Sequence, residues 1–232
     1  MKPFAVLKNN AKLPASTVLW DHPKANDTVY VEKIKKYNTG LVYALSKRCF
    51  DIIASLFGLI VLFIPLLLVS LIVVIDSPGG PFYSQTRLGK DEKPFTLYKF
   101  RTMRIDAESD GARWADDDDP RVTKIGRVLR NTRIDELPQL VNILLGQMSF
   151  VGPRPERPEF YDVFDTYIIG YRQRMKVLPG LTGYAQVMGG YDLYPEEKIV
   201  YDIKYIENQS FKLDIYCILK TVGIVFSGRG AR

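Results

Sequence analysis

The most prominent feature of the hydropathy pattern is an apolar segment at residues 52–75, "IIASLFGLIVLFIPLLLVSLIVVI", in which 24 consecutive residues carry no charge. As one continuous helix this segment would be about 36 Å long, which exceeds the bilayer hydrocarbon core of about 30 Å. Pro65 lies inside it and removes a backbone hydrogen bond, so the pattern predicts a break at this residue. The arms of 13 and 10 residues would reach only roughly 20 and 15 Å, so neither could span a membrane alone.

Positive charge flanks the apolar segment on both sides. The positive-inside rule places such flanks on the cytoplasmic side of a membrane. A re-entrant helix–break–helix satisfies this rule at both ends, whereas a spanning helix satisfies it at one end only. We therefore favour the re-entrant form, and a spanning helix stays open because proline is also tolerated in spanning helices. The flanking cations are Lys33, Lys35, Lys36, Lys47 and Arg48 before the segment and Arg87, Lys90, Lys93, Lys99 and Arg101 after it.

The residues that follow alternate between short apolar stretches and turn-forming residues. Phe82–Thr86 and Pro94–Phe100 are predicted to be two short strands around a Gly89-Lys90 turn. Pro138–Leu145 is predicted to be a helix that stops at Gly146. The glycines of "LPGLTGYAQVMGGY", residues 178–191, predict a loop in which they either permit close approach of a ligand or make turns.

The last apolar segment, "FKLDIYCILKTVGIVF" at residues 211–226, has helical spacing and predicts an amphipathic helix that faces the core or lies on a bilayer. The pattern as a whole predicts an α+β fold that is mostly helical. We expect a re-entrant membrane segment and a small cytoplasmic domain with a short β-hairpin and amphipathic interfacial helices. The expected divisions are an N-terminal extension at 1–40, the re-entrant helix at 41–76 and the cytoplasmic domain at 77–232.

Charge and residue usage restrict the chemistry. The 232 residues carry a net charge of +6, which favours acidic partners such as phosphorylated small molecules, anionic lipid or nucleic acid. The chain has one histidine, His22, and two distant cysteines, Cys49 and Cys217. These counts argue against histidine-dependent triads, histidine-rich metal sites and a disulfide framework. Catalysis would therefore depend on carboxylates and basic residues.

Two charge clusters have an ordinary and a functional interpretation. The run "ADDDDP", with Asp116 to Asp119, could hold a metal, but charge runs are usually solvated loops and we favour a loop. Lys124, Arg127, Arg130 and Arg133 follow one another at three-residue steps. On a helix this spacing keeps neighbouring side chains on one side, where they form either an anion site or a solvated basic face.

The stretch "RIDELPQL", residues 133–140, places Asp135 and Glu136 side by side before Pro138. Acidic residues at a helix start often cap backbone N–H groups and interact favourably with the helix dipole. The same helix start, near Leu137, would offer free N–H groups to phosphate oxygens. Capping and catalysis are therefore compatible for this pair, and on the residues alone capping is the commoner role.

The order of the motifs resembles that of a known enzyme family. The matching segments are "SKRCFDIIAS", "PFYSQTRLGKDEKPFTLYKFRTM", "DPRVTKIGRVLRNTRIDELPQLVNILLGQMSFVGPRP", "PGLTGYAQV" and "YDIKYIENQSFKLDIYCILKTVGIVFSGRGA". Together they resemble the bacterial sugar transferases of the polyprenyl-phosphate hexose-1-phosphate transferase family, the monotopic phosphoglycosyl transferases. The resemblance extends from about residue 41 to the end, and its most specific part is "RIDELPQLVNILLGQMSFVGPRP".

The resemblance implies a two-step reaction on the cytoplasmic face of the inner membrane, with residues 77–232 as the cytoplasmic catalytic domain. A carboxylate attacks the sugar-side phosphate of a UDP-sugar and releases UMP, and undecaprenyl phosphate then takes the phosphosugar from the enzyme. By the same resemblance Asp135 is the nucleophile, and Glu136 beside it shares a required Mg²⁺ with it. The substrate-binding candidates are all basic residues: Lys99, Arg101, Arg130, Arg133 and Arg154. Pro65 matches the family's helix break.

Two positions depart from the family pattern. Ile64 precedes Pro65 where serine is frequent, so a side-chain hydrogen bond at the break is missing. Leu178 stands before "PGLTG" where a basic residue is frequent, which removes a phosphate contact from that position. Neither departure affects Asp135.

The expected partners are a UDP-sugar, undecaprenyl phosphate and inner-membrane lipid, with no nucleic acid and with a homodimer left open. A catalytically silent membrane scaffold of a glycan assembly complex is the main alternative function. It is disfavoured because such a scaffold would not need Asp135, Glu136, Lys99 and Arg130 together. A nucleic-acid-binding protein is a third alternative, and the chain contains no recognisable nucleic-acid-binding module.

Overall fold

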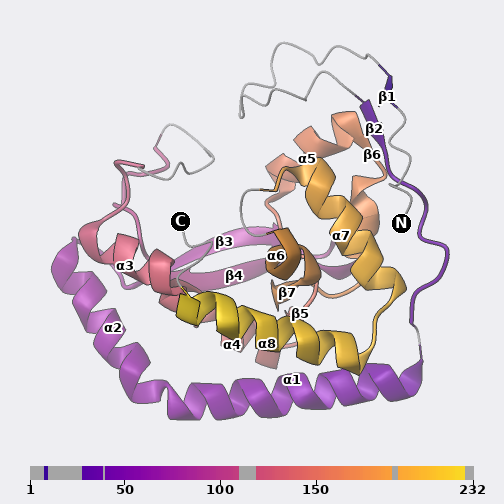
Figure 1. The fold of residues 1–232 in the computed structure, drawn as a ribbon. Coiled ribbons are helices and arrows are strands. Elements are labelled where there is room, and N and C mark those ends of the chain that lie inside the picture. The colour runs from indigo at the N-terminus through magenta and orange to yellow at the C-terminus, as the bar shows by residue number, and fades with distance from the viewer. Residues whose placement is uncertain (1–7, 10–27, 39, 110–118, 190–192, 228–232) are drawn as a thin grey trace.

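Two long helices form the base of the protein, and the remaining elements lie above them (Figure 1). Helix α1 comprises Leu41–Val61 and runs along the bottom of Figure 1, and α2 comprises Phe63–Asp76 and turns upward beside α3, Lys124–Thr132. The computed structural model describes residues 8–9, 28–38, 40–109, 119–189 and 193–227.

The apolar segment is bent by 62° between α1 and α2. Within the described ranges no single helix is both long and apolar enough to cross a membrane, and only the bent pair meets that requirement as a unit. The helix–break–helix prediction is confirmed, but the break lies at Leu62 and not at Pro65. Pro65 occupies the first turn of α2, where a backbone N–H has no intrahelical acceptor, so proline is tolerated there and the chain bends just before it.

The inner face of α1 is polar and is bonded to the domain above it. The Arg48 guanidinium donates to the carbonyl oxygens of Ile143 and Leu144 at 2.7 and 2.8 Å, which satisfies the carboxyl end of α4, Gln139–Leu144. Asp51 is fully buried, and its Oδ1 accepts from the Phe150 backbone N–H at 3.0 Å. Arg48 and Asp51 therefore hold the two segments that lie directly above α1.

A second buried cluster joins α1 to the C-terminal helix α8, Phe211–Ser227. Lys47 Nζ donates to Asp214 Oδ2 at 2.9 Å, and the Tyr43 hydroxyl donates to the same oxygen at 2.9 Å. The Tyr205 hydroxyl donates to Asp214 Oδ1 at 2.6 Å from α7, Pro195–Glu207. Three donors thus satisfy one buried carboxylate, which is the condition under which a buried charge is tolerated.

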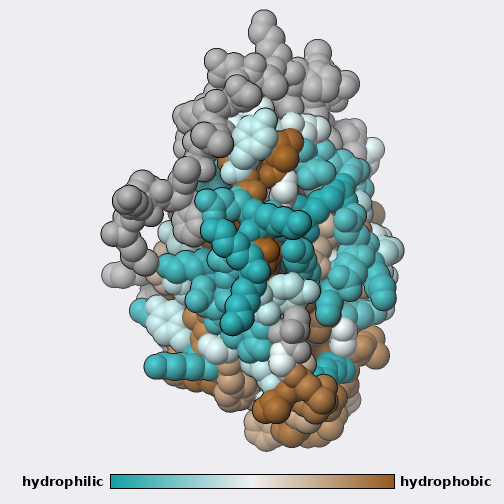
Figure 2. Space-filling view, turned by 90° about the vertical axis from the view of Figure 1, so that its right-hand side faces the viewer, coloured by the Kyte–Doolittle hydropathy of each residue, from teal (hydrophilic) through white to brown (hydrophobic). Residues whose placement is uncertain are grey.

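The outer face of α1 and α2 is apolar and exposed. Figure 2 shows the hydrophobic edge at the bottom of the molecule and hydrophilic residues over the face above it. An exposed apolar surface of this extent marks a membrane or protein contact. The exposed residues include Leu41, Val42, Leu45, Ile53, Leu56, Phe57, Ile60, Val61, Phe63, Ile64, Leu67, Leu68, Leu71, Ile72, Val74 and Ile75.

The predicted β-hairpin is present. Strands β3, Phe82–Leu88, and β4, Pro94–Phe100, are antiparallel with Tyr83 opposite Lys99, so β3 is two residues longer than predicted. A short 3₁₀ turn, η1, at Lys90–Glu92 joins them. The buried amide of Asn142 on α4 accepts from Tyr98 N and donates to Thr96 O, which fixes the hairpin against α4.

The loop predicted at 178–191 is wrong over the described residues 178–189, and its last two residues lie outside the described ranges. The described part forms β7, Gly180–Thr182, which pairs in parallel with β5, Ser149–Val151, and it continues into α6, Tyr184–Gly189. A Cβ atom on Gly180 would lie 2.1 Å from the Gly152 nitrogen. Here the glycine therefore permits the close approach of two backbone segments, and neither ligand approach nor a simple turn explains it.

The main core lies above these strands. Aromatic side chains of α5, Pro158–Tyr167, and of the 3₁₀ helix η3, Tyr171–Lys176, pack together with α7 and α8. The predicted C-terminal amphipathic helix is confirmed: α8 buries Asp214 and Cys217 while Leu219 on the same helix is exposed.

Part of the segment before α1 is built into the domain. Strand β2, Thr28–Tyr30, pairs in parallel with β6, Ile168–Ile169, and in antiparallel with β1, Lys8–Asn9. Val29 and Ile34 are buried in the main core.

We predict that Asp51→Ala lowers the free energy of unfolding by about 1–3 kcal/mol, because it leaves the Phe150 N–H and the Ser149 hydroxyl without their buried acceptor. Asp51→Asn keeps an acceptor oxygen and should lose less. Thermal unfolding in nanodiscs measures both, with Cys49→Ala as the control because Cys49 is the exposed neighbour on α1. Equal unfolding temperatures for Asp51→Ala and Cys49→Ala would contradict this account of the helix contact.

Candidate active site

Asp135 and Glu136 lie in a short 3₁₀ turn, η2, at Ile134–Glu136. Arg133 adopts a left-handed conformation with φ of 59°, which ends α3 and starts this turn. The Leu137 N–H donates to the Ile134 carbonyl at 3.1 Å, so it is not free for a phosphate, contrary to our prediction.

The capping role predicted for Asp135 is also wrong. Helix α4 begins at Gln139, its N-cap residue is Pro138, and no side chain caps it. The pair lies within η2, and two residues separate it from the start of α4, so the Asp135 carboxylate does not cap that helix.

The Asp135 carboxyl group is buried. Burial, and then the adjacent charge of Glu136, raise the pKa of Asp135 to about 7, against the opposing charges of Lys99, Arg154 and Arg130. A buried carboxyl group with a raised pKa is a more basic oxygen nucleophile than an exposed one. Such perturbed groups concentrate at functional sites.

Glu136 behaves differently although it is the next residue. Its Oε1 accepts a short, charge-assisted hydrogen bond from Arg154 Nη2. Burial opposes its ionisation, but the charges of Arg154, Arg133 and Lys99 outweigh burial and lower the pKa of Glu136. The two adjacent carboxyl groups are thus poised differently, with Glu136 ionised and Asp135 near the midpoint of its titration at neutral pH.

Lys99 approaches the pair from strand β4. Its ammonium group lies 5.1 Å from the centre of the Tyr83 ring on β3, within reach of a cation–π interaction. Burial, and then the charge of Arg87, lower the pKa of Lys99 to about 8. Lys99 can therefore lose its proton at a pH that is only slightly above neutral.

Of the four basic residues spaced along α3, two approach the pair. Arg130 donates from Nε to the Thr102 hydroxyl at 2.9 Å, and its charge opposes the raised pKa of Asp135. Arg133 lies beside Glu136 and favours its charged form. Lys124 and Arg127 are exposed. Two of the four basic residues, Arg130 and Arg133, therefore belong to the candidate site, and the other two lie on an exposed face.

Arg101 is the predicted substrate-binding residue that the structure places elsewhere. Its buried guanidinium donates to the Gly80 carbonyl at 2.7 Å and to the hydroxyl and carbonyl of Ser77. These bonds hold the turn after α2, so Arg101 has a positioning role there and is not aimed at the carboxylate pair.

Arg87 is a site residue that the sequence analysis counted only as a flanking charge. Its guanidinium donates to the Gln85 side chain and to the Pro155 carbonyl at 3.1 Å, and its charge acts on Lys99 and Arg154. The alternation of polar residues at 83, 85 and 87 along β3 could have identified it, since they share one face of the strand.

A second set of charges stabilises the loop that carries Arg154. Glu156 is buried and accepts from Arg87 at 3.5 Å. Arg174, fully buried, lies 4.0 Å from Glu156 and pairs with Asp202 at 2.7 Å. This network fixes the loop that follows β5, and with it the Arg154 guanidinium.

The acidic run lies partly outside the described residues, which include Asp119 but not Asp116, Asp117 or Asp118. Asp119 is buried and paired with Arg121, so the prediction of a solvated loop is wrong at this residue. The hydrogen bond from Arg121 lowers the pKa of Asp119.

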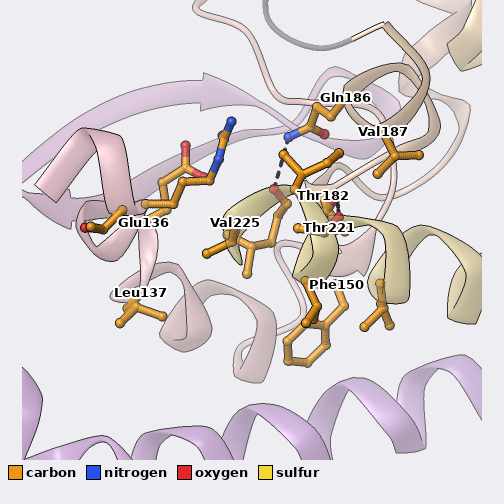
Figure 3. Close-up of a pocket in the computed structure, with 14 residues that line it drawn as sticks. Glu136, Leu137, Phe150, Thr182, Gln186, Val187, Thr221 and Val225 are labelled. Atoms are coloured by element: carbon orange, nitrogen blue, oxygen red, sulfur yellow. Dashed lines mark hydrogen bonds between the residues drawn. The ribbon is translucent and has the colours of Figure 1, made fainter. Parts of the chain in front are cut away.

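A cavity of about 250 Å³ adjoins η2, the candidate catalytic turn (Figure 3). Glu136 and Leu137 lie on one side of it, and Thr221 and Val225 of α8 lie on the other. Phe150 lies toward α1.

Asp135 and Glu136 fit the needs of Mg²⁺. The described residues contain no cluster of three or more histidine, cysteine, aspartate or glutamate side chains that could hold a metal alone. Mg²⁺ is usually bound by one or two carboxylates together with substrate phosphates and water, so a larger cluster is unnecessary. The pKa of the buried Asp135 carboxyl stays raised despite the cations near it, so a further cation that arrives with the substrate would favour its ionised form.

Comparison with known proteins identifies relatives over most of the chain. The family model described as "Bacterial sugar transferase" matches residues 42–228. The Aeromonas hydrophila protein named UDP-N-acetylgalactosamine-undecaprenyl-phosphate N-acetylgalactosaminephosphotransferase is 44% identical over 195 residues, which are 82% of this chain and 46% of that protein.

Two further relatives have other names. The Escherichia coli (strain K12) UDP-glucose:undecaprenyl-phosphate glucose-1-phosphate transferase is 37% identical over 217 residues, 90% of this chain and 47% of that protein. The Rhizobium leguminosarum bv. phaseoli "Exopolysaccharide production protein PSS" is 42% identical over 185 residues, 76% of this chain and 92% of that protein. The chain thus spans about half the length of the first two relatives and matches nearly all of the third.

We predict a bell-shaped dependence of kcat/KM on pH for transfer from a UDP-sugar. Asp135 must lose its proton to act as a nucleophile, and its raised pKa puts the rising limb near pH 7. Lys99 must keep its proton to attract phosphate, so the rate should fall near pH 8. Lys99→Arg should remove the falling limb, whereas Lys93→Arg, at an exposed lysine, should not. A rising limb near pH 4, where ordinary aspartates titrate, would contradict the burial argument.

Proposed function

Because the chain belongs to the bacterial sugar transferase family, we propose that it transfers a sugar 1-phosphate from a UDP-sugar to undecaprenyl phosphate and releases UMP. The names of its relatives support these substrates. The names differ in the sugar, N-acetylgalactosamine in one and glucose in another, so the proposal extends to the sugar 1-phosphate and not to one sugar. In a bacterium this would be the first membrane step of glycan assembly.

The observation that carries the proposal is the pair of unequal carboxyl groups beside several cations. The UDP-sugar diphosphate would meet Lys99, Arg130 and Arg154 at the turn that presents Asp135. Phosphoryl transfer depends mainly on positioning and on neutralising charge, and these side chains supply both without a histidine.

The first step is attack by an Asp135 carboxylate oxygen on the sugar-side phosphorus. A bond forms between that oxygen and phosphorus, and the bond from phosphorus to the bridging oxygen breaks. UMP leaves with the electron pair, and an acyl phosphate remains, the mixed anhydride of the Asp135 carboxyl group and the sugar phosphate. In the second step an oxygen of undecaprenyl phosphate attacks the same phosphorus, which releases the Asp135 carboxylate and forms the lipid diphosphate sugar.

The electrostatics support Asp135 and not Glu136 as the nucleophile. Glu136 is held by Arg154, and its lowered pKa makes it the less basic of the two. Asp135 has the raised pKa and therefore the more basic oxygen. Glu136 would orient Arg154 toward the phosphate and contribute to the metal site.

Asp135 and Glu136 would hold Mg²⁺ together with the diphosphate of the donor. The ion would neutralise the negative charge that builds up on the leaving phosphate. Arg130 and Arg154 would also help to neutralise this charge.

We place the protein at the cytoplasmic face of the inner membrane, with α1 and α2 as a re-entrant pair. The apolar outer face of both helices and the 62° bend support this arrangement. A catalytically silent scaffold would gain nothing from a buried carboxyl group with a raised pKa, which costs stability and suits a nucleophile.

Asp135→Asn should abolish nucleotide release, because it keeps the shape of the side chain and removes the nucleophile. With a UDP-sugar and no acceptor, the wild-type protein should release close to one equivalent of UMP in a single turnover. Mass spectrometry of the intact protein should then show the added phosphosugar, and peptide mapping should locate it at Asp135.

Glu136→Gln is the matched control, since it changes the neighbouring carboxyl and retains Asp135. It should slow the reaction but still form the adduct. If no adduct forms on the wild-type protein and UMP appears only when both substrates are present, transfer is direct and the covalent proposal is wrong.

The re-entrant arrangement predicts that both ends of the apolar segment stay in the cytoplasm. Single cysteines introduced at Gly40 and Lys90 in a background without Cys49 and Cys217 should be protected from a membrane-impermeant thiol reagent in intact cells. Both should react after the cells are opened. Labelling of either site from the periplasm would establish a spanning helix.

A further inference from the structure

The cavity beside the catalytic turn presents mainly hydrocarbon. Its lining comes from segments far apart in the sequence that meet above α1: η2, β5, β7, α6 and α8. The apolar lining residues are Leu137, Phe150, Leu181, Val187, Ile218, Val222, Ile224 and Val225.

Most polar groups in the lining are bonded to one another. The Thr182 and Thr221 hydroxyls lie 2.6 Å apart, and Thr221 donates to the Cys217 carbonyl at 2.8 Å. Gln186 donates from Nε2 to the Leu181 carbonyl at 3.2 Å, while its Oε1 has no hydrogen-bond partner within the described part of the chain. Away from Thr132, Arg133 and Glu136, the cavity therefore suits hydrocarbon better than a sugar, whose several hydroxyl groups would meet few polar atoms there.

One end of the cavity is polar and belongs to the catalytic turn. Thr132, Arg133 and Glu136 line it there, next to Asp135. A ligand that fills the cavity with hydrocarbon would thus place its head group beside the nucleophile, and the Arg133 cation suits an anionic head group. The cavity and the turn together match an amphiphile with one charged end.

The other end of the cavity leads to exposed apolar side chains of α8. Val222 and Val225 line the cavity and are nevertheless 47% and 37% exposed. Helix α1, which carries the apolar outer face, passes beneath the cavity (Figure 3). A lipid chain can therefore leave the cavity on the side where the protein faces a membrane.

We propose that this cavity binds the first isoprene units of the acceptor lipid and holds its phosphate at Arg133, beside Asp135. The proposal rests on the proposed function, and it assigns α8 and β7 to the acceptor in the second step. The UDP-sugar lacks a hydrocarbon part and would bind on the side of Lys99 and Arg154. The covalent phosphosugar on Asp135 would then lie between the two substrate sites.

Filling the cavity tests this assignment. Val222→Trp in the full-length protein in nanodiscs should raise the KM for undecaprenyl phosphate at least tenfold, with less than twofold change in single-turnover UMP release without acceptor. Leu219→Trp is the matched control, because Leu219 lies on the same helix, is 66% exposed and does not line the cavity. It should change neither quantity by more than twofold.

The outcomes separate this proposal from the proposed function. No UMP release from the wild-type protein with both a UDP-sugar and undecaprenyl phosphate present would overturn the proposed function itself. Normal release, together with equal acceptor KM values for Val222→Trp and Leu219→Trp, would overturn the cavity assignment alone. A raised KM for the UDP-sugar in Val222→Trp would indicate that the cavity binds the donor sugar, and would also overturn the assignment of the cavity to the acceptor lipid.

A measurement on the unaltered protein avoids any folding defect of the variant. A polyprenyl phosphate with a diazirine on its first isoprene unit should label peptides from β5 and α8 after illumination. Excess undecaprenyl phosphate should prevent the labelling, and excess UDP-sugar should not. Labelling confined to α1 and α2 would show that the whole chain of the lipid stays outside the cavity.

Discussion

The polar inner face of α1 is the constraint on which the catalytic turn depends. Arg48 binds the end of α4, the helix that directly follows Asp135 and Glu136, and Asp51 binds the Phe150 N–H in β5, the strand that leads to the Arg154 loop. The Glu136–Arg154 ion pair then joins the two segments across the site. One helix face therefore sets both halves of the site, and its apolar opposite face is the part of the protein suited to a membrane. The geometry of the candidate site and the orientation of the apolar face are linked in this way.

Burial and unequal pairing explain the state of the two carboxyl groups. Burying a carboxylate is costly unless it is paired, and Arg154 pairs with Glu136, whereas burial and the charge of Glu136 raise the pKa of Asp135. Burial, and then the charge of Arg87, lower the pKa of Lys99. The cations repel one another, and a bound diphosphate would relieve this repulsion. An anionic substrate would thus reduce the electrostatic repulsion between the basic side chains of the site.

Periodicity predicted the parts of the fold that depend on local patterns: the bent apolar pair, the β-hairpin and the C-terminal helix. It failed where distant contacts decide. Arg101 follows Lys99 by two residues, but β4 ends at Phe100, so the two side chains separate. The flanking charges were also overcounted, because Lys47, Arg48, Arg87, Lys99 and Arg101 are bound within the protein. The remaining five are exposed, three before the segment and two after it, and still favour cytoplasmic placement at both ends.

The motif resemblance named Asp135, Glu136, Lys99, Arg130 and Arg154, and it assigned the attack to Asp135. The sequence does not contain the electrostatic difference between the two adjacent acids. That difference arises because Arg154, from a loop 18 residues later, donates a hydrogen bond to Glu136, whereas burial dominates at Asp135. An aspartyl phosphate is prone to hydrolysis, so the proposed nucleophile would gain from being the buried member of the pair that Arg154 leaves without a hydrogen bond within the described residues. The burial that raises the pKa of Asp135 would also keep water from its acyl phosphate, while the apolar cavity beside it suits a lipid phosphate as the proposed second reactant.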